Sequence, residues 1–266
     1  DSCAGAGIQA DIKTFSQLGC YGMSVVTAST SQTHLGVNDV HALPVKHVEA
    51  QLLSLLKTYE VSAIKTGMLA SSEHIKMISD VLCNYGDIPV VCDPVLSASS
   101  GANWSTANIK TALLESLAPN TDLLTPNLAE TNQLFCDGAS EEQTDKYHDR
   151  LIESVTNFCR DTDTTILLKG GHADLQEEHV TDRLFSKDKE PKAYSHPRVE
   201  TGNTHGTGCT LASAITSFIA RGHSMEDSVA LAIQYLQRII GQSKGFLHAQ
   251  AREPAHNLPM NHFYTE

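Results

Sequence analysis

Short apolar segments alternate with segments of helical periodicity along most of this chain, and this alternation restricts the fold more than any other feature. The apolar segments are too short for most helices and show no polar face, which is typical of strands in a parallel sheet covered by helices on both sides. We therefore predict an α/β fold with a central, mostly parallel sheet. The strand-like segments are 22–29, 62–66, 88–92, 122–125 and 165–169.

Segments with helical periodicity separate these strands. In residues 6–18, Ile8, Ile12 and Phe15 share one face, and Gly19 follows at a position where glycine favours a helix end. Residues 180–198 interrupt the alternation and are typical of a β-hairpin with a charged turn. One further helix is predicted to begin at Pro44 and another after the capping residue Ser71. The remaining predicted helices cover about 106–117, 127–136, 141–160, 206–221 and 225–241.

The length and composition fit one domain. With 266 residues, of which 41% are hydrophobic, the chain can bury a full core, and we predict one domain over residues 1–266. The chain begins with DSCAGAG, a turn-like opening to a helix with no strand before it. Because a strand normally precedes such a turn in an α/β fold, either this sequence lacks the first strand or the fold forms without it.

The charge balance is acidic, with 19 basic and 31 acidic residues and a net charge of −12. This disfavours nucleic acids and anionic membranes as main partners, so a bound anion must be held by local groups. No apolar run approaches the length of a membrane span, and the first residues lack the features of a signal peptide. We predict a soluble, cytoplasmic protein.

The seven cysteines and thirteen histidines show no metal-binding spacing. No CxxC pair and no HExxH motif is present, so neither a disulfide framework nor a zinc site is predicted. We expect free thiols, most of them buried and unreactive.

Polar or otherwise unusual side chains follow the predicted strands. Because ligands of open α/β sheets bind at the carboxyl ends of the strands, we predict a ligand site at this edge. Lys169 ends a strand where an apolar residue is expected, which leaves two interpretations: a side chain that reaches solvent, or one that contacts phosphate. The other residues at these ends are Gln32, Met68, Asp93, Asn127 and Glu130.

The sequence Gly206-Thr207-Gly208 opens a predicted helix. Its backbone N–H groups can converge on an anion, and the helix N-terminus stabilises charge that develops in phosphoryl transfer. Alternatively, the glycines only allow close helix packing. The sequence contains neither a P-loop motif nor a dinucleotide fingerprint.

Asp93 and Glu130 are candidates for holding Mg²⁺, directly or through water, because Mg²⁺ prefers one or two carboxylates together with phosphate oxygens. Each residue has an alternative interpretation. Asp93 precedes Pro94 and could be a turn residue, and Glu130 lies in the first turn of a predicted helix, where a carboxylate complements the helix dipole.

Six motifs carry a family resemblance: GAGIQADIKTFSQLGCYG (5–22), KTGML (65–69), CDPV (92–95), LTPNLAET (124–131), LLKGGH (167–172) and NTHGTGCTLASA (203–214). Together they resemble the hydroxymethylpyrimidine and phosphomethylpyrimidine kinases of thiamine biosynthesis, in the ribokinase-like superfamily. The resemblance implies a three-layer α/β/α sandwich and a homodimer. It also implies two successive transfers from ATP with Mg²⁺, first to 4-amino-5-hydroxymethyl-2-methylpyrimidine and then to its monophosphate.

The resemblance also implies roles for individual residues. On the substrate side, Gln32 and Met68 would contact the pyrimidine, near Gly7 and Asp11. The residues that would serve Mg²⁺ and the phosphates of ATP are Asp93, Asn127, Glu130, Lys169 and Thr204. The anion site would consist of Gly206, Thr207 and Gly208, with Cys209 as the catalytic residue.

Cys209 stands where a carboxylate base is expected. A helix N-terminus lowers the pKa of a thiol, so we expect Cys209 to be partly thiolate near neutrality and able to accept the hydroxymethyl proton. The second acceptor is an anionic phosphate that needs no base, and a permanent carboxylate would repel it, whereas a thiol can stay neutral. The alternative is a small residue that fills space behind the turn.

Three departures from the family pattern leave other functions open. Ala4 replaces a glycine, the strand before the first turn is missing, and AHNLPMNH (255–262) replaces the family motif GHGPVNH. The alternatives are a pyridoxal or pyridoxine kinase, which uses the same loops, and a catalytically silent homologue that binds the pyrimidine.

Overall fold

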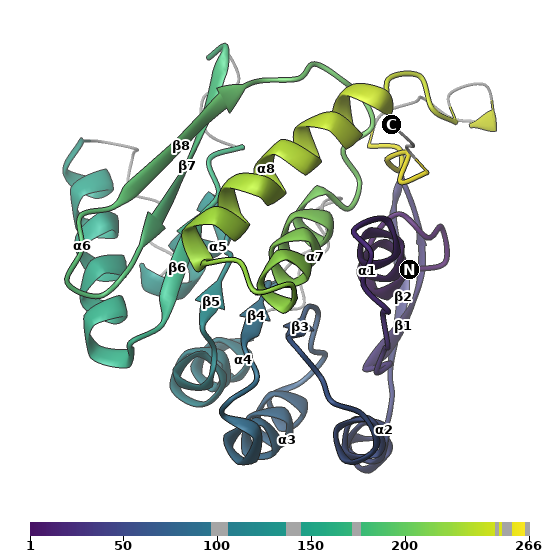
Figure 1. The fold of residues 1–266 in the computed structure, drawn as a ribbon, viewed down its shortest axis with the longest axis vertical. Helices are drawn as coiled ribbons and strands as arrows, with labels where there is room; N and C mark the ends of the chain where they lie inside the picture. Colours follow the sequence, from purple (N-terminus) through teal and green to yellow (C-terminus); the bar gives the residue numbers. More distant parts are fainter. Residues whose placement is uncertain (97–105, 137–144, 172–176, 248–249, 252–256, 264–266) are drawn as a thin grey trace.

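A six-stranded sheet forms the centre of this computed structural model (Figure 1). The structure describes residues 1–96, 106–136, 145–171, 177–247, 250–251 and 257–263. Neighbouring strands from β3 to β6 run parallel, whereas β7 and β8 join antiparallel, so the predicted mostly parallel sheet is confirmed. In spatial order the strands are β3 (Ile64–Thr66), β4 (Val90–Cys92), β5 (Leu123–Leu124), β6 (Thr165–Leu168), β7 (His179–Phe185) and β8 (Lys192–Pro197).

Successive residues of the central strands pack on opposite faces of the sheet, and both faces are buried. In β4, Val90 and Cys92 belong to one hydrophobic core and Val91 to the other. In β5, Leu124 and Leu123 divide in the same way. This double burial explains why the strand segments are apolar throughout.

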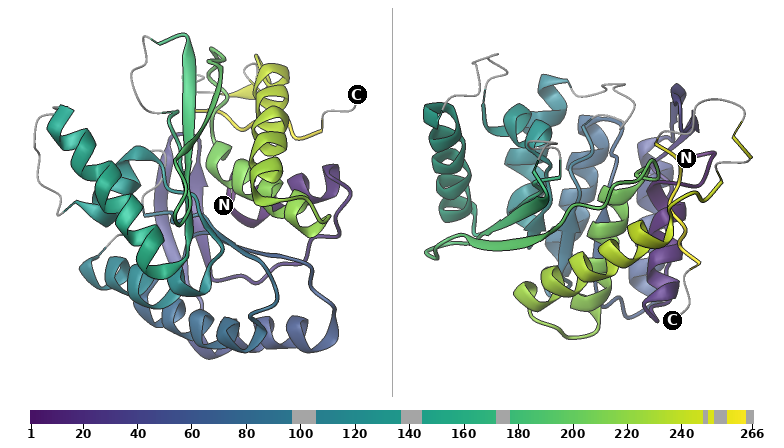
Figure 2. Two further views of the ribbon diagram at one scale, coloured as in Figure 1. Left: turned by 60° about the vertical axis from the view of Figure 1, so that its left-hand side comes forward. Right: turned by 90° about the horizontal axis from the view of Figure 1, so that it is seen from above.

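Helices cover both faces and complete the predicted three-layer sandwich (Figures 1 and 2). The helices α3 to α6 contribute to one core, α7 and α8 contribute to the other, and α1 packs against α7. The helices are α1 (Gly7–Gln17), α2 (Val45–Thr58), α3 (Ser72–Leu82), α4 (Ala107–Ala112), α5 (Leu128–Phe135), α6 (Asp145–Thr162), α7 (Thr207–Ala220) and α8 (Met225–Gln242).

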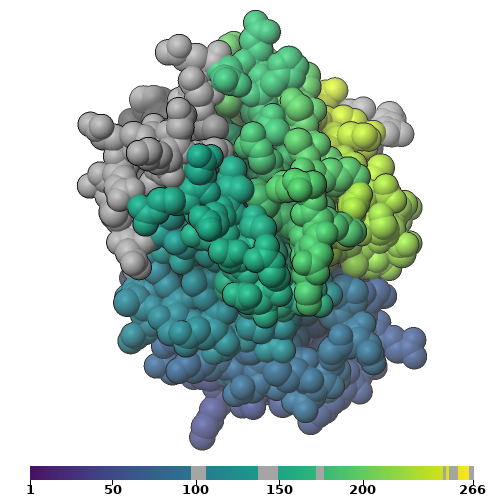
Figure 3. All heavy atoms as spheres, turned by 90° about the vertical axis from the view of Figure 1, so that its left-hand side faces the viewer, coloured from purple at the N-terminus to yellow at the C-terminus, as the bar shows by residue number. Residues whose placement is uncertain are grey.

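The predicted hairpin near 180–198 is confirmed. The strands β7 and β8 pair antiparallel, and β7 also pairs with β6, so the hairpin extends the main sheet. Figure 3 shows the hairpin in green beside the teal helix α6 on one side of the molecule.

The predicted strand at 22–29 is wrong for most of its length. Residues 22–27 pair with no strand among the described residues, and the N–H and C=O of Val26 bind the side-chain amide of Gln51 instead, at 3.1 and 3.2 Å. The ladder begins only at β1 (Ala28–Thr33), which pairs antiparallel with β2 (Gly36–Ala42) in a separate sheet. Half-buried and exposed residues alternate in β1, as expected for a ribbon with one face in solvent.

The predicted helices are present, with small shifts at their ends. Ser71 caps α3 by accepting a hydrogen bond from the His74 N–H at 3.3 Å. The helix predicted at 106–117 is α-helical only to Ala112 and continues as a π-helical turn over Leu113–Leu117. Residues 141–144 of another predicted helix lie outside the described residues. Among the helices that the structure describes, none combines the length and apolar character required to cross a membrane.

Candidate functional site

All of the site residues predicted above line one cavity of about 1560 Å³. Met68, Asp93, Asn127 and Lys169 reach it from the carboxyl ends of β3 to β6, and the N-termini of α1 and α7 contribute to its wall. The structure thus brings the residues together, while their individual roles remain predictions.

A buried ion pair follows two central strands. Asp93 comes after β4 and Lys169 after β6, and Lys169 Nζ lies 2.9 Å from Asp93 Oδ1. Thr125 Oγ1 donates to the same oxygen at 3.2 Å. Although burial opposes both charges, Lys169 and Lys65 hold the pKa of Asp93 below its ordinary value, and Asp93 raises the pKa of Lys169. Lys169 is therefore bound to a carboxylate and does not extend into bulk solvent.

Asn127 and Glu130 form a capping box at the start of α5. The Asn127 side chain accepts a hydrogen bond from the Glu130 N–H at 2.9 Å, and Glu130 Oε2 accepts one from the Asn127 N–H at 2.8 Å. Glu130 therefore stabilises the first turn of the helix, as one of its two interpretations requires. It also lines the cavity, and burial raises its pKa to about 7 despite the nearby Lys169.

The glycine turn brings backbone close to this ion pair. Gly206 adopts a left-handed conformation with φ of 86° at the N-cap of α7, and a Cβ there would collide with the Gly5 carbonyl. A Cβ at Gly208 would lie 3.3 Å from Lys169 Nζ and 3.6 Å from Asp93 Oδ2. The glycines therefore permit close approach at the cavity, beyond any part they have in helix packing.

A second buried ion pair lines the same cavity. Lys65 of β3 binds both carboxylate oxygens of Asp11 on α1, at 2.9 and 3.1 Å, and Ser213 of α7 donates to Asp11 Oδ1 at 2.7 Å. No role was predicted for Lys65 from the sequence. The signal that identified Lys169, a lysine in a buried strand segment, was present at Lys65 as well.

The two ion pairs present opposite charges to the cavity. In one pair the Lys169 side chain is 13% exposed and Asp93 only 3%, whereas in the other Lys65 is 3% exposed and Asp11 11%. Burial raises the pKa of Asp11, while Asp11 raises the pKa of Lys65 against the effect of its own burial. All four side chains line the cavity, and the more exposed partner is the cation in one pair and the carboxylate in the other.

Cys209 lies in the first turn of α7, within the electrostatic influence of both pairs. Burial raises the pKa of its thiol, although Lys65 and the Gly7 N–H act in the opposite direction. The prediction that the pKa of Cys209 is lowered is therefore wrong. At this helix N-terminus, the loss of water around the sulfur, together with the charges of Asp11 and Asp93, outweighs the effects of Lys65 and the Gly7 N–H.

Gln32 and Met68 are tied to neighbouring loops by their backbone groups. The Gln32 C=O accepts a hydrogen bond from Ser2 Oγ at 2.7 Å, and the Gln32 N–H donates to Ser2 Oγ at 2.9 Å. The Met68 C=O accepts from Thr27 Oγ1 at 2.9 Å. Thr204, also on the cavity wall, is exposed.

The C-terminal segment contacts α7 and the residues just before the glycine turn, despite its altered motif. The Leu258 N–H donates to the Gly202 C=O at 2.9 Å, and the His205 N–H donates to the Leu258 C=O at 3.2 Å. His262 Nε2 lies 2.9 Å from Thr210 Oγ1.

All seven cysteines are free, as predicted, but only Cys92 and Cys159 are buried. The prediction that most are buried is therefore wrong, because the scattered cysteines lie largely on loops and helix ends, where an apolar pattern does not report burial.

A model of the phosphomethylpyrimidine kinase family matches residues 1–254. The chain belongs to the phosphomethylpyrimidine kinase family. Over 258 residues it is 37% identical to the hydroxymethylpyrimidine/phosphomethylpyrimidine kinase of Rhizobium meliloti, covering 97% of this chain and 94% of that relative. Over 240 residues, or 90% of this chain, it is 39% identical to the bifunctional thiamine biosynthesis protein ThiED of Geobacter sulfurreducens, of which it spans about half, 47%.

Solved structures confirm the ribokinase-like fold. The phosphomethylpyrimidine kinase of Clostridium difficile 630 is 33% identical with a TM-score of 0.74, covering 90% of this chain and 95% of that one. The pyridoxal kinase of Bacillus subtilis, solved as an ADP complex, is 28% identical with a TM-score of 0.80, covering 98% and 93%. The fold is thus shared with a pyridoxal kinase, whereas sequence identity is higher to the phosphomethylpyrimidine kinase.

Within this phosphomethylpyrimidine kinase family member, Asp93 and Glu130 have the chemistry to hold a divalent cation. Both residues are buried, at 2% and 4% exposure, and lie close enough to influence each other electrostatically. Two buried carboxylates that share the field of Lys169 would both be stabilised in the ionised form by a bound cation. Carboxylate oxygens suit Mg²⁺.

Proposed function

We propose that this phosphotransferase phosphorylates 4-amino-5-hydroxymethyl-2-methylpyrimidine with ATP and then phosphorylates the monophosphate to the diphosphate. The observation that carries the proposal, beyond family membership, is that the more exposed partner is a lysine in one buried ion pair and a carboxylate in the other. A substrate with hydrogen-bond donors on its ring and an acceptor for phosphate requires a carboxylate and a cation on the wall of one cavity.

The Asp11 carboxylate faces the cavity and suits the exocyclic amino group of the pyrimidine. Such a group donates N–H bonds, and a hydrogen bond to a charged acceptor is stronger than one between neutral groups. Gln32 and Met68 line the same cavity and complete the substrate side.

Lys169 and the glycine turn suit the phosphoryl group that is transferred. Lys169 offers a cation beside Gly208, where the first N–H groups of α7 have no partner within the helix. Asp93 and Glu130 would hold Mg²⁺, which when bound neutralises charge on phosphate oxygens. Asn127 and Thr204 line this part of the reaction cavity and would contact the phosphates of ATP.

The two transfers differ in whether they need Cys209 as a base. In the first, the hydroxymethyl oxygen forms a bond to the γ-phosphorus while the bond from that phosphorus to ADP breaks, and the hydroxyl proton passes to the Cys209 thiolate. Because burial raises the pKa of Cys209, this thiolate is the minor form at neutral pH. The second transfer starts from an anionic phosphate oxygen and needs no base, so the neutral thiol is adequate.

The variant Cys209→Asp tests this division of roles. We expect the first transfer to be retained and the second to become slower, because a permanent carboxylate repels the bound monophosphate. Separate assays with each acceptor measure the two rates. Equal losses in both transfers, or better retention of the second, would contradict the proposed role of Cys209.

A coupled ATPase assay with the pyrimidine and with pyridoxal distinguishes the activity from the alternatives. We expect turnover of the pyrimidine, since its amino group matches Asp11. Turnover of pyridoxal alone would assign the protein to the other vitamin kinases, and turnover of neither would indicate a silent homologue. We further propose that the protein acts in the cytoplasm as a homodimer, which sedimentation analysis would test.

A further inference from the structure

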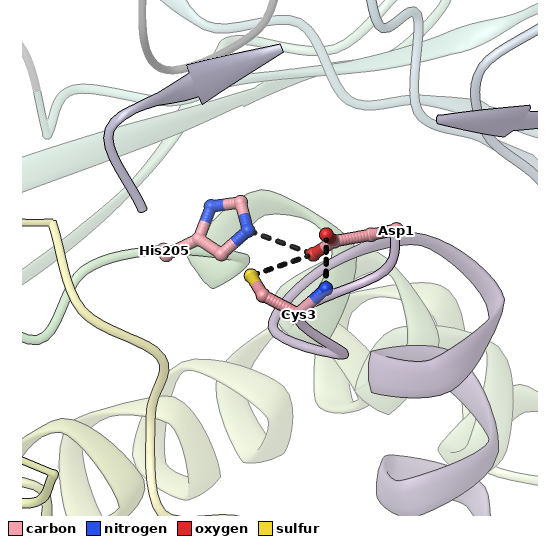
Figure 4. Close-up of side chains that lie close together, drawn as sticks. All are labelled: Asp1, Cys3 and His205. Atoms are coloured by element: carbon pink, nitrogen blue, oxygen red, sulfur yellow. Dashed lines mark hydrogen bonds and ion pairs between the residues drawn. The ribbon is translucent and has the colours of Figure 1, made fainter. Parts of the chain in front are cut away.

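Three side chains of different chemistry meet beside the glycine turn (Figure 4). Residues 1–6 form a turn before α1, and Asp1 Oδ2 at its start lies 2.8 Å from His205 Nε2. The Cys3 thiol donates to the same oxygen at 3.5 Å. One ligand atom from each of the three residues lies within 4.8 Å of the others.

We propose that Asp1, Cys3 and His205 form a binding site for a thiophilic divalent transition-metal ion such as Zn²⁺. Thiolate, imidazole and carboxylate are the three ligand types that Zn²⁺ takes in proteins, and three protein ligands leave one position open to water. The site differs in residues and in chemistry from the carboxylates of Asp93 and Glu130, whose oxygens suit Mg²⁺.

The three donors already lie near the geometry that the ion requires. Around a tetrahedral Zn²⁺ with bonds of about 2.0–2.3 Å, ligand atoms are roughly 3.3–3.7 Å apart. The His205–Asp1 and Cys3–Asp1 separations are 2.8 and 3.5 Å. The third separation, between Cys3 and His205, is within 4.8 Å, so entry of an ion requires the donors to move by up to about 1.5 Å.

The surrounding backbone holds two of the ligands in place. The Asp1 carboxylate accepts hydrogen bonds from the N–H groups of Cys3, Gly5 and Ala6, at 3.0, 3.1 and 2.9 Å. A carboxylate accepts at about four positions, two on each oxygen, so Gly5 and Ala6 occupy those of Oδ2, and the position left for an ion is on Oδ1 beside the bond from Cys3. His205 is buried, and a Cβ at Gly5 would collide with its ring.

Binding of the ion changes protonation in a defined way. Nε2 can bind the ion when the neutral His205 ring carries its proton on Nδ1, a buried atom that has no hydrogen-bond partner among the described residues, and the Cys3 thiol releases one proton to solvent. Cys3 is only partly buried, which leaves a path to the sulfur. Although burial raises the pKa of this thiol, the His205 ring and the Gly5 N–H bring it below its ordinary value.

An ion at this position joins two segments that are far apart in the sequence. Asp1 and His205 are separated by 204 positions. Gly206 follows His205 and packs against the Gly5 carbonyl, so the ion would connect the turn before α1 to the turn before α7. Ligands that bind only the folded state stabilise it, and we expect Zn²⁺ to raise the melting temperature.

A Co²⁺ titration of the full chain, in buffer with excess Mg²⁺, tests the proposal. We expect one equivalent of Co²⁺ to produce a thiolate-to-cobalt charge-transfer band that Zn²⁺ removes by displacement. Cys3→Ser should lose the band and weaken Zn²⁺ binding by more than about tenfold, the least that loss of even an outer-shell partner causes. The matched control Cys20→Ser, which removes another partly buried thiol, should keep both.

A band that persists in Cys3→Ser, or no band in the wild-type protein, would overturn the proposal. If Cys3→Ser does not fold, wild-type protein decides the question through protection of Cys3 from iodoacetamide by Zn²⁺. Cys20 serves as the internal reference in the peptide mass spectra, and equal labelling of Cys3 with and without Zn²⁺ would reject the site. None of these readouts uses kinase activity, so the metal site and the proposed function can fail independently.

Discussion

Two buried lysine–aspartate pairs line the same cavity and differ in which partner is more exposed. Lys169 is more exposed than Asp93, whereas Asp11 is more exposed than Lys65. A buried ion pair by itself contributes little net stability, so pairing alone does not explain either lysine. Both pairs consist of a lysine and an aspartate. The more exposed partner of each pair therefore indicates which ligand group that pair can bind, and the residue types alone do not.

The variant Lys65→Met should have the largest effect on stability. It leaves the Asp11 carboxylate buried without its cation, which lowers the free energy of unfolding by about 3–5 kcal/mol. Chemical denaturation measures this loss. The double variant Asp11→Asn/Lys65→Met should recover much of it, and a double variant as unstable as Lys65→Met would show that the two residues are not coupled.

The variant Lys169→Met should affect the reaction more than the fold. We expect kcat to fall roughly 100- to 1000-fold, as when one donor to a developing charge is removed. The free energy of unfolding should fall less than in Lys65→Met, because each carboxylate keeps a hydroxyl bond but only Asp93 also keeps the field of a second lysine, Lys65. Steady-state kinetics measures kcat, and chemical denaturation measures the free energy of unfolding.

Lys187→Met is the matched control for this comparison, since Lys187 belongs to an exposed ion pair, and it should change neither kcat nor stability. Similar stability losses in Lys65→Met and Lys169→Met, with kcat retained in Lys169→Met, would remove the distinction between the pairs.

The variant Asp11→Asn should weaken pyrimidine binding. Loss of a hydrogen bond to a charged acceptor corresponds to about 1.5–3 kcal/mol, which raises KM for the pyrimidine roughly 10- to 100-fold. KM for ATP should stay the same, because Lys169 and the glycine turn are intact. Asp161→Asn, an exposed change on α6, is the control. Parallel increases in both KM values would indicate a general disturbance of the site.

The smallest expected effect is the pH dependence of the first transfer. Since the pKa of Cys209 is raised, the thiolate fraction increases with pH, and the first transfer should become faster as pH rises toward that pKa, while the second should not. The Asp11 carboxylate contributes to this raised pKa, so Asp11→Asn should move the increase to lower pH. Single-turnover rates for each acceptor measure both profiles, and coinciding profiles would argue against Cys209 as the proton acceptor.

Much of the fold could be predicted because its signals are local. The helix that begins after Ser71 and the hairpin at 180–198 depend on capping residues, turn residues and periodicity within each segment. The irregular conformation of residues 22–27 could not be predicted in this way. Their apolar pattern matches a buried strand, but their backbone groups are bound by the side chain of Gln51 from another element.

The sequence by itself determined the order of strands and helices from the helix after Pro44 onward, the edge of the sheet where polar residues collect, and the glycine turn, because these depend on neighbours along the chain. Only the tertiary structure decided which partner of each ion pair is more exposed and in which direction the pKa of Cys209 moves. It alone joined Lys65 to Asp11, Lys169 to Asp93 and His205 to Asp1, across 54, 76 and 204 positions. Burial and charge act through space, so a sequence pattern that reports local neighbours cannot reveal them.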